Sequence, residues 1–100
     1  MKIKNVYIYE LRRGKSIDVT DEFFEDNNDK NDFIEDINNL KALNREALQD
    51  LLVYYNTTFI FYSSNIRTEN YIDLKNQKIV FPYQVDYNGF KHGLKVVLEC

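Results

Sequence analysis

Few residues of this chain have side chains suited to catalysis. His92 is the one histidine, so a metal site built on several histidines is excluded and any histidine-dependent catalysis has to use this residue. Its place next to Gly93 in an alternating strand indicates a structural histidine at the margin of a sheet. Cys100 is the one cysteine, and Ser63 and Ser64 lack the flanking glycines of a nucleophile elbow. We therefore expect no catalytic residue, no metal ion and no cofactor, and predict that the protein is not an enzyme.

Sequence patterns for anion and calcium loops are equally scarce. The chain has three glycines, including Gly89 and Gly93, too few and too scattered for a dinucleotide fingerprint or a Walker loop. Arg12-Arg13-Gly14-Lys15 is a basic turn that could hold a phosphate, although basic hairpin turns are commonly just solvated. An EF-hand loop started at Asp26 has no glutamate at its twelfth position, which excludes that calcium motif.

The most distinctive feature of the chain is a run of carboxylates in its first half. Within residues 21–36, offset only by Lys30, stand Asp21, Glu22, Glu25, Asp26, Asp29, Asp32, Glu35 and Asp36. Net charge is −3, but residues 21–50 carry −7, from three bases and ten acids. Residues 1–20 carry +3 (five bases, two acids) and residues 51–100 carry +1 (five bases, four acids). A basic footprint for nucleic acid is missing, so we expect no direct binding to nucleic acid.

This acidic run has two interpretations. It is either a solvated surface that keeps a small protein soluble, or a surface that imitates the spaced phosphates of a nucleic acid and docks on a basic nucleic-acid-binding protein. Carboxylates three and four residues apart on a helix lie about 5–6 Å apart, which approximates the phosphate row of one strand. The eight carboxylates are therefore the candidate partner-binding residues.

The preferred hypothesis is a small, non-enzymatic protein-binding module, namely an inhibitor or antagonist from a phage or mobile element. The chain is short, has no catalytic constellation and is rich in Asn, Lys, Ile and Tyr, a composition typical of AT-rich genomes. The alternative is a structural or accessory protein that forms a homodimer through an apolar sheet face. Neither a secretory leader nor a run of apolar residues long enough to span a membrane is apparent, so we expect a cytoplasmic protein without a membrane partner.

Hydrophobic periodicity predicts the elements that carry these residues. Residues 3–11 are apolar on both faces and predict a strand buried on both sides, followed by a short return strand. Thr20 or Asp21 is expected to cap a short helical turn. Residues 27–31, rich in Asn and Asp, are expected to break what precedes them, so that a longer helix begins at Asp32.

A further helix is predicted after Asn44, a favoured N-cap residue, and residues 57–62 return to strand chemistry. The two longer helices form an α-hairpin or one helix kinked near Asn44. The inward residues of the second are Ala47, Leu48, Leu51, Leu52 and Tyr55.

Asn88-Gly89 predicts a hairpin with a type I′ turn, because both positions need positive φ. If that turn closes, paired residue numbers sum to 177. Asp86 then faces Lys91 and Lys78 faces Glu99, two pairs of opposite charge that favour this register.

A second hairpin around Asn76-Gln77 would place Leu74 against Ile79 and Ile72 against Phe81, and Pro82 is expected at an edge or bulge. The predicted fold is one α+β domain over residues 1–100, in the order β-β-α-α-β-β-β-β. It is an antiparallel sheet of about five to six strands with an α-hairpin packed on one face.

The opposite face of that sheet is predicted to carry Val80 and Val97 without helices to cover them. Three candidates could cover this face: the segment with Phe23 and Phe24, a second copy of the protein, or a partner.

Overall fold

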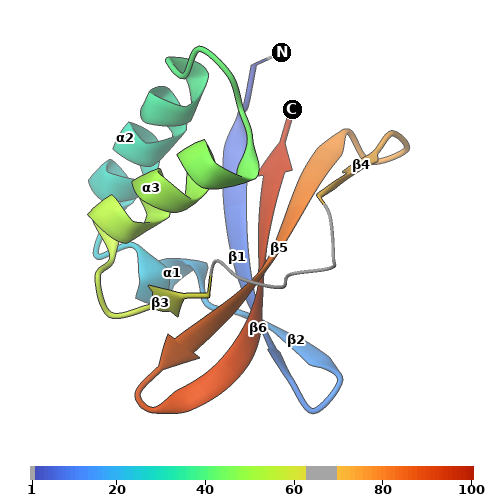
Figure 1. Cartoon of the computed structure of the whole chain (residues 1–100). Coiled ribbons are helices and arrows are strands. Elements are labelled where there is room, and N and C mark those ends of the chain that lie inside the picture. The colour runs from blue at the N-terminus through green and yellow to red at the C-terminus, as the bar shows by residue number, and fades with distance from the viewer. Residues whose placement is uncertain (1, 63–69) are drawn as a thin grey trace.

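A six-stranded antiparallel sheet organises the chain in the computed structural model, which describes residues 2–62 and 70–100 (Figure 1). The elements are, in chain order, β1 (Asn5–Arg12), β2 (Lys15–Asp18), α1 (Thr20–Phe23), α2 (Asn27–Asn38), α3 (Arg45–Tyr55), β3 (Ile60–Phe61), β4 (Tyr71–Asp73), β5 (Lys78–Tyr87) and β6 (Phe90–Glu99). The strands are ordered β2-β1-β6-β5-β3, and β4 also pairs with β5. The predicted α+β class and element order are confirmed.

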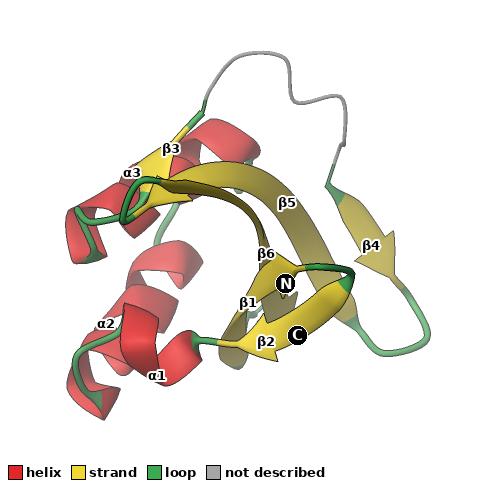
Figure 2. Cartoon of the chain, turned by 90° about the horizontal axis from the view of Figure 1, so that it is seen from below, coloured by secondary structure: helices red, strands yellow, loops and turns green. Residues whose placement is uncertain are grey.

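The helices cover one face of this sheet, and Figure 2 shows all three on the same side of the strongly curved strands. The core lies between the two layers. Its largest fully buried side chains are Tyr83, Phe23, Phe33, Phe81, Ile8, Leu48, Leu52, Leu94, Leu98, Val6, Val85 and Val96. No helix among the described residues is long and apolar enough to cross a membrane.

The C-terminal hairpin has the predicted register. Asp86 faces Lys91 and Lys78 faces Glu99, as the sum of 177 requires. The turn residue Asn88 has φ 55°, and the glycine that follows it also has a positive φ. Both residues adopt the left-handed conformation of a type I′ turn, which together with the two pairs of opposite charge favours this register.

The register of the β4–β5 hairpin differs from the prediction by two residues. Ile72 faces Ile79 rather than Phe81, and the chain turns through residues 74–77 instead of a two-residue turn. The reason is a pair of hydrogen bonds: the Asp73 carboxylate accepts from the backbone N and from the Nδ2 of Asn76, at 3.2 and 2.8 Å. These two bonds stabilise a wider turn, as Asp commonly does at the first turn position.

Pro82 lies at the outer edge of β5, as predicted. Among the described residues, β4 pairs with residues 78–80 of β5 and β3 pairs with residues 85–86, which leaves Pro82 between them. The carbonyl of Gln84 accepts a bond from the N–H of Tyr62 at this outer edge, at 2.9 Å. Pro82 stands two residues before Gln84, so its nitrogen faces the same outer edge. The N–H that proline lacks is therefore not one that the ladder with β6 needs.

The prediction that residues 27–31 break the chain before a helix is wrong. α2 begins at Asn27, and its N-cap is Asp26, whose side chain accepts a bond from the N–H of Asp29 at 2.9 Å. A capping carboxylate satisfies one of the unpaired N–H groups of a first turn, so the Asn and Asp side chains beyond it need not compete with the backbone.

The predicted caps of the first helical turn are also wrong. The N-cap of α1 is Val19, with no side-chain bond. Thr20 is buried instead, and its Oγ1 accepts a bond from the N–H of Ile8 (2.9 Å) while donating to Asp18 (2.6 Å). Asp21 remains exposed on α1. Thr20 thus connects the start of α1 to the strand that it covers.

The first strand is buried on one side only, in contrast to the prediction for both. Val6 and Ile8 point into the core, whereas Tyr7 and Tyr9 are half-buried on the opposite face. The segment with Phe23 and Phe24 does not cover that opposite face, because both rings belong to the core on the helix side.

The valines of the open sheet face are nevertheless buried. Val80 is 6% exposed and Val97 is 7% exposed. The two lie in one row across the sheet, between Tyr7 on β1 and Tyr71 on β4. The Nζ of Lys78 lies 5.6 Å from the centroid of the Tyr7 ring, so a lysine stem adds to the cover. Side chains of the face itself therefore shield the valines.

Replacing the N-cap Asn44 by alanine is expected to lower the free energy of unfolding by about 1 kcal/mol. The Oδ1 of Asn44 accepts a bond from the N–H of Ala47 at 2.8 Å, which confirms the predicted cap of α3. Urea denaturation measures the change. Asn28→Ala is the matched control, since Asn28 is exposed in the first turn of α2. Equal losses in the two variants would contradict a capping role.

Candidate functional site

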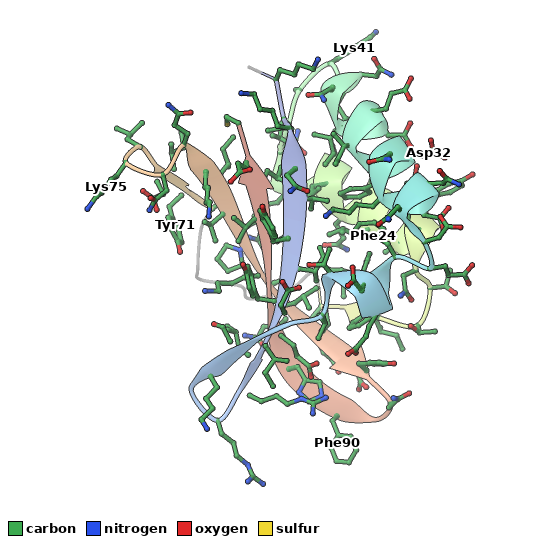
Figure 3. The ribbon with its side chains drawn as sticks, turned by 180° about the vertical axis from the view of Figure 1, so that it is seen from behind. Phe24, Asp32, Lys41, Tyr71, Lys75 and Phe90 are labelled. Atoms are coloured by element: carbon green, nitrogen blue, oxygen red, sulfur yellow. The ribbon has the colours of Figure 1, made fainter. Side chains whose placement is uncertain are left out.

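The eight carboxylates of residues 21–36 lie together on α1, on α2 and on the connection between them. Asp29 and Asp36 are half-buried and the other six are exposed. Figure 3 labels Asp32 on the outer side of α2, where further oxygen-bearing side chains point away from the sheet. Asp21 lines two shallow hollows, one with Glu25 and one with Glu22. We call these eight residues the acidic surface.

Two members of the acidic surface also stabilise the fold. Asp26 caps α2. Asp36 accepts a hydrogen bond of 2.6 Å from the hydroxyl of Tyr55 and so connects α2 to α3. Burial, and then this hydrogen bond, raise the pKa of Tyr55 well above its ordinary range. The six remaining carboxylates have no side-chain hydrogen bond within the described part of the chain.

The charge of the acidic surface is not compensated by ion pairs. In residues 2–62 and 70–100, both recorded ion pairs involve Glu10, and none of the eight carboxylates has a basic nitrogen within 4.0 Å. Lys30, the base inside the run, instead places its Nζ 5.7 Å from the centroid of the Tyr7 ring. Six of the eight carboxylates consequently face solvent without an ion pair, and Lys30 lines the two hollows beside them.

An exposed aromatic ring borders this block. Tyr54 of α3 is 79% exposed, and its ring centroid lies 5.4 Å from that of Tyr55, whose hydroxyl binds Asp36. Val53, beside it, is 40% exposed. Tyrosine is enriched at protein–protein interfaces relative to the rest of the surface. Tyr54 is not among the inward residues predicted for this helix, in agreement with its exposure.

A buried carboxylate that the sequence analysis did not single out lies at the other end of the sheet. Glu10 is 4% exposed, and its Oε1 accepts a 2.6 Å bond from the Nε of Arg12 and lies 3.3 Å from the Nδ1 of His92. The alternation of Val6, Ile8 and Glu10 along β1 does place Glu10 on the buried face. His92 is half-buried at the sheet margin, where its structural role was predicted.

Arg45, a half-buried residue with a buried guanidinium end, lies at the start of α3. Its guanidinium carbon is 4.4 Å from the centroid of the Tyr83 ring, and both Nη atoms are buried with no hydrogen-bond partner in the described residues. The Tyr83 hydroxyl donates to the carbonyl of Arg45 at 2.8 Å. Arg45 and Tyr83 thus fix the N-terminal end of α3 on β5 through a cation–π contact and a hydrogen bond.

The remaining candidates for chemistry do not form a cluster. Ser63 and Ser64 lie outside the described residues. Cys100 is half-buried, and its N–H donates to the carbonyl of Gln77 at 2.9 Å. Within the part of the chain that the structure describes, no group of three His, Cys, Asp or Glu side chains is arranged to hold a metal ion.

Comparison with known proteins adds no assignment: no protein-family model matches the chain, and neither a curated protein nor a solved structure matches it significantly.

Proposed function

We propose that the protein is a non-enzymatic protein-binding module that docks its acidic surface on a basic cleft of another protein. The observation that carries this proposal is the absence of ion pairs to the eight carboxylates in residues 2–62 and 70–100. Like charges three and four residues apart on a helix repel by a few tenths of a kcal/mol per pair, roughly, so fold stability alone does not favour this arrangement. Basic side chains of a partner would neutralise it.

The frame that carries the acidic surface supports the proposal. α2 is held at its start by the Asp26 cap and at its end by Asn38, whose amide group exchanges two hydrogen bonds with the backbone of Ile3, at 2.8 and 2.9 Å. The hydrogen bond between Tyr55 and Asp36 attaches the side of α2 to α3. A surface that is already ordered loses less entropy on binding, which favours affinity.

An inhibitor or antagonist is the finer form of this proposal. Asp29, Asp32 and Asp36 follow one another at spacings of three and four residues on α2 and approximate one row of phosphates. If the partner's cleft is a site for nucleic acid, the protein would exclude nucleic acid from it. Competition between the protein and an oligonucleotide for the captured partner tests this step.

The alternative proposal is self-association through the open sheet face. The cover of Val80 and Val97 by neighbouring side chains leaves less apolar area for such a dimer than their positions alone suggest. Size-exclusion chromatography with light scattering separates the two proposals, because a docking module is monomeric without its partner.

The acidic surface is tested with the double variant Asp32→Lys/Glu35→Lys. Neither side chain has an internal hydrogen bond among the described residues, so the fold should be kept. The partner is captured from the source cells, and its affinity for wild type and variant is measured at low and high salt. Each reversal removes a close charge pair worth about 1.5 kcal/mol or more, so affinity should fall about 100-fold or more. Wild-type binding should also weaken steeply as salt rises.

The matched control is Glu46→Lys/Asp50→Lys, which makes the same charge change at exposed positions of α3 outside the acidic surface. This variant should bind within a few-fold of wild type. Wild-type affinity of Asp32→Lys/Glu35→Lys at low salt would show that the acidic surface is only solvated. Equal losses in both double variants would indicate a response to net charge and would also contradict the proposed contact.

A further inference from the structure

A pocket lies between the two hairpin tips at the end of the sheet away from β4. The pairing of β1 with β6 ends at Leu11 and Gly93, and the two hairpins diverge beyond that point (Figure 1). The pocket between them has a volume of about 580 Å³. That volume is in the range of small-molecule sites, about 300–1,000 Å³. Residues that line it include Leu11, Arg12 and Arg13 from one hairpin and Phe90, Lys91 and His92 from the other.

The lining is basic. Arg12, Arg13 and Lys91 line the pocket, and no acidic residue is among the described residues that do. Arg12 is paired with Glu10, and the Nζ of Lys91 lies 5.5 Å from the centroid of the Tyr62 ring. Arg13 is therefore the lining cation without such a contact among the described residues. Lys15, which the sequence places in the same basic turn, does not line the pocket. The second hairpin supplies what the turn alone lacks: the concave shape and an aromatic ring.

Arg12 is held in one orientation by a buried carboxylate. Its Nε binds Glu10 at 2.6 Å, while the side chain of Arg12 remains 55% exposed. The terminal Nη1 and Nη2 have no hydrogen-bond partner among the described residues, and Arg12 lines the pocket. A guanidinium fork with two parallel N–H donors matches the oxygens of a phosphate or carboxylate. The same Oε1 of Glu10 also lies 3.3 Å from the Nδ1 of His92, which lines the pocket.

Phe90 supplies an apolar platform next to these donors. Its side chain is 68% exposed, and its ring centroid lies 6.4 Å from that of His92. An exposed ring beside basic side chains is the combination that binds planar groups carrying phosphates, because the ring stacks while the cations neutralise charge.

We propose that this pocket binds a small phosphate monoester that carries a planar ring, with the phosphate on Arg12 and Arg13 and the ring on Phe90. A phosphate monoester, with a charge of about −1.5 to −2 near neutral pH, matches two guanidinium groups better than a singly charged carboxylate does. The pocket is separate from the acidic surface, as the positions of Phe90 and Asp32 in Figure 3 show. The proposal therefore stands independently of the proposed function.

Phenyl phosphate, inorganic phosphate and benzoate serve as probes in titrations of the full chain, followed by calorimetry and by the amide resonances of Gly89 and Gly93. Phenyl phosphate should bind about tenfold tighter than inorganic phosphate, since stacking on one ring contributes at least that factor. Benzoate should bind more weakly than phenyl phosphate. Phe90→Ala should remove the advantage of phenyl phosphate and leave inorganic phosphate unchanged.

Arg13→Gln should weaken phenyl phosphate and inorganic phosphate alike, by about tenfold. Arg13 is exposed and has no bond to Glu10 among the described residues, so this variant keeps the buried ion pair that Arg12→Gln would break. The control is Lys75→Gln, an equal charge change in the β4–β5 turn, at the opposite end of the molecule in Figure 3. It should leave both affinities unchanged. Lack of saturation by phenyl phosphate in the millimolar range, or equal affinities in wild type and Phe90→Ala, would overturn the proposal.

Discussion

Replacing Phe33 by alanine is expected to lower the free energy of unfolding by about 3–5 kcal/mol. Phe33 is 0% exposed at the centre of the helical layer. Its ring centroid lies 5.1 Å from that of Phe24 and 5.3 Å from that of Tyr55, so one side chain connects the end of α1, α2 and α3. Truncation removes the transfer free energy of the ring and leaves a cavity that the surrounding rings cannot fill.

A loss of this size is a large part of the stability of a small domain, which is about 5–15 kcal/mol. Urea denaturation of wild type and variant measures the change, when the unfolding free energy falls with urea at the same slope in both. Phe33→Leu should lose clearly less, because leucine retains most of the apolar volume. Val53→Ala, at a position that is 40% exposed on α3, should lose little. A loss below about 1 kcal/mol for Phe33→Ala would show that the helical layer is not packed around this ring.

Local chemistry made parts of the fold predictable. The register of the β5–β6 hairpin follows from Asn88 and the glycine after it, because a type I′ turn needs two residues with positive φ and fixes every pair beyond it. The start of α3 follows from Asn44 for a similar reason, since its side chain and the N–H of Ala47 are three residues apart. In both places, the interaction that decides the structure lies within a few residues of sequence.

Competing local interactions explain the errors. Asp73 could end a strand or stabilise a wide turn, and its two bonds to Asn76 select the turn, which shifts β4 by two residues. The Asp26 side chain could compete with the backbone for hydrogen bonds or cap the helix that follows. It caps the helix, so α2 begins at Asn27, five residues before the predicted Asp32. Sequence patterns give both options in each case, and their relative free energies depend on packing that lies far away in sequence.

The candidate sites likewise differ in how much of them could be predicted from the sequence. The acidic surface is contiguous in sequence, so its eight members could be predicted, but the place of Asp29 inside α2 and the roles of individual carboxylates could not. The bond from Tyr55 to Asp36 depends on how two helices pack. The cluster of Glu10 and His92 exists because β1 pairs with β6, which brings together residues from the two ends of the chain. The basic pocket between the two hairpin tips, which His92 lines, therefore follows only from the tertiary structure.

Replacing Thr20 by valine is expected to lower the free energy of unfolding by about 1–3 kcal/mol, although the side chain keeps its shape. The Thr20 hydroxyl is the acceptor for the N–H of Ile8, in a buried bond of 2.9 Å. Valine cannot accept, so a buried N–H would lose its partner, and the full desolvation cost of that group would appear. Thr20→Ser retains the hydroxyl and should lose less.

The same substitution should change the response of stability to acid. The hydroxyl and the N–H of Thr20 both donate to Asp18, and these bonds, the hydroxyl first, lower the pKa of that carboxyl. A carboxyl with a lowered pKa stabilises the fold at pH values above its unfolded pKa, about 3.9, and this contribution is lost as the pH falls through the folded value. Thr20→Val keeps the N–H but removes the hydroxyl, so its stability should fall less between pH 5 and pH 3, about one unit on either side of that pKa. Urea denaturation of wild type, Thr20→Val and Asp18→Asn at both pH values measures the difference. An acid response of Thr20→Val as steep as that of wild type would show that the hydroxyl does not stabilise the charged form of Asp18.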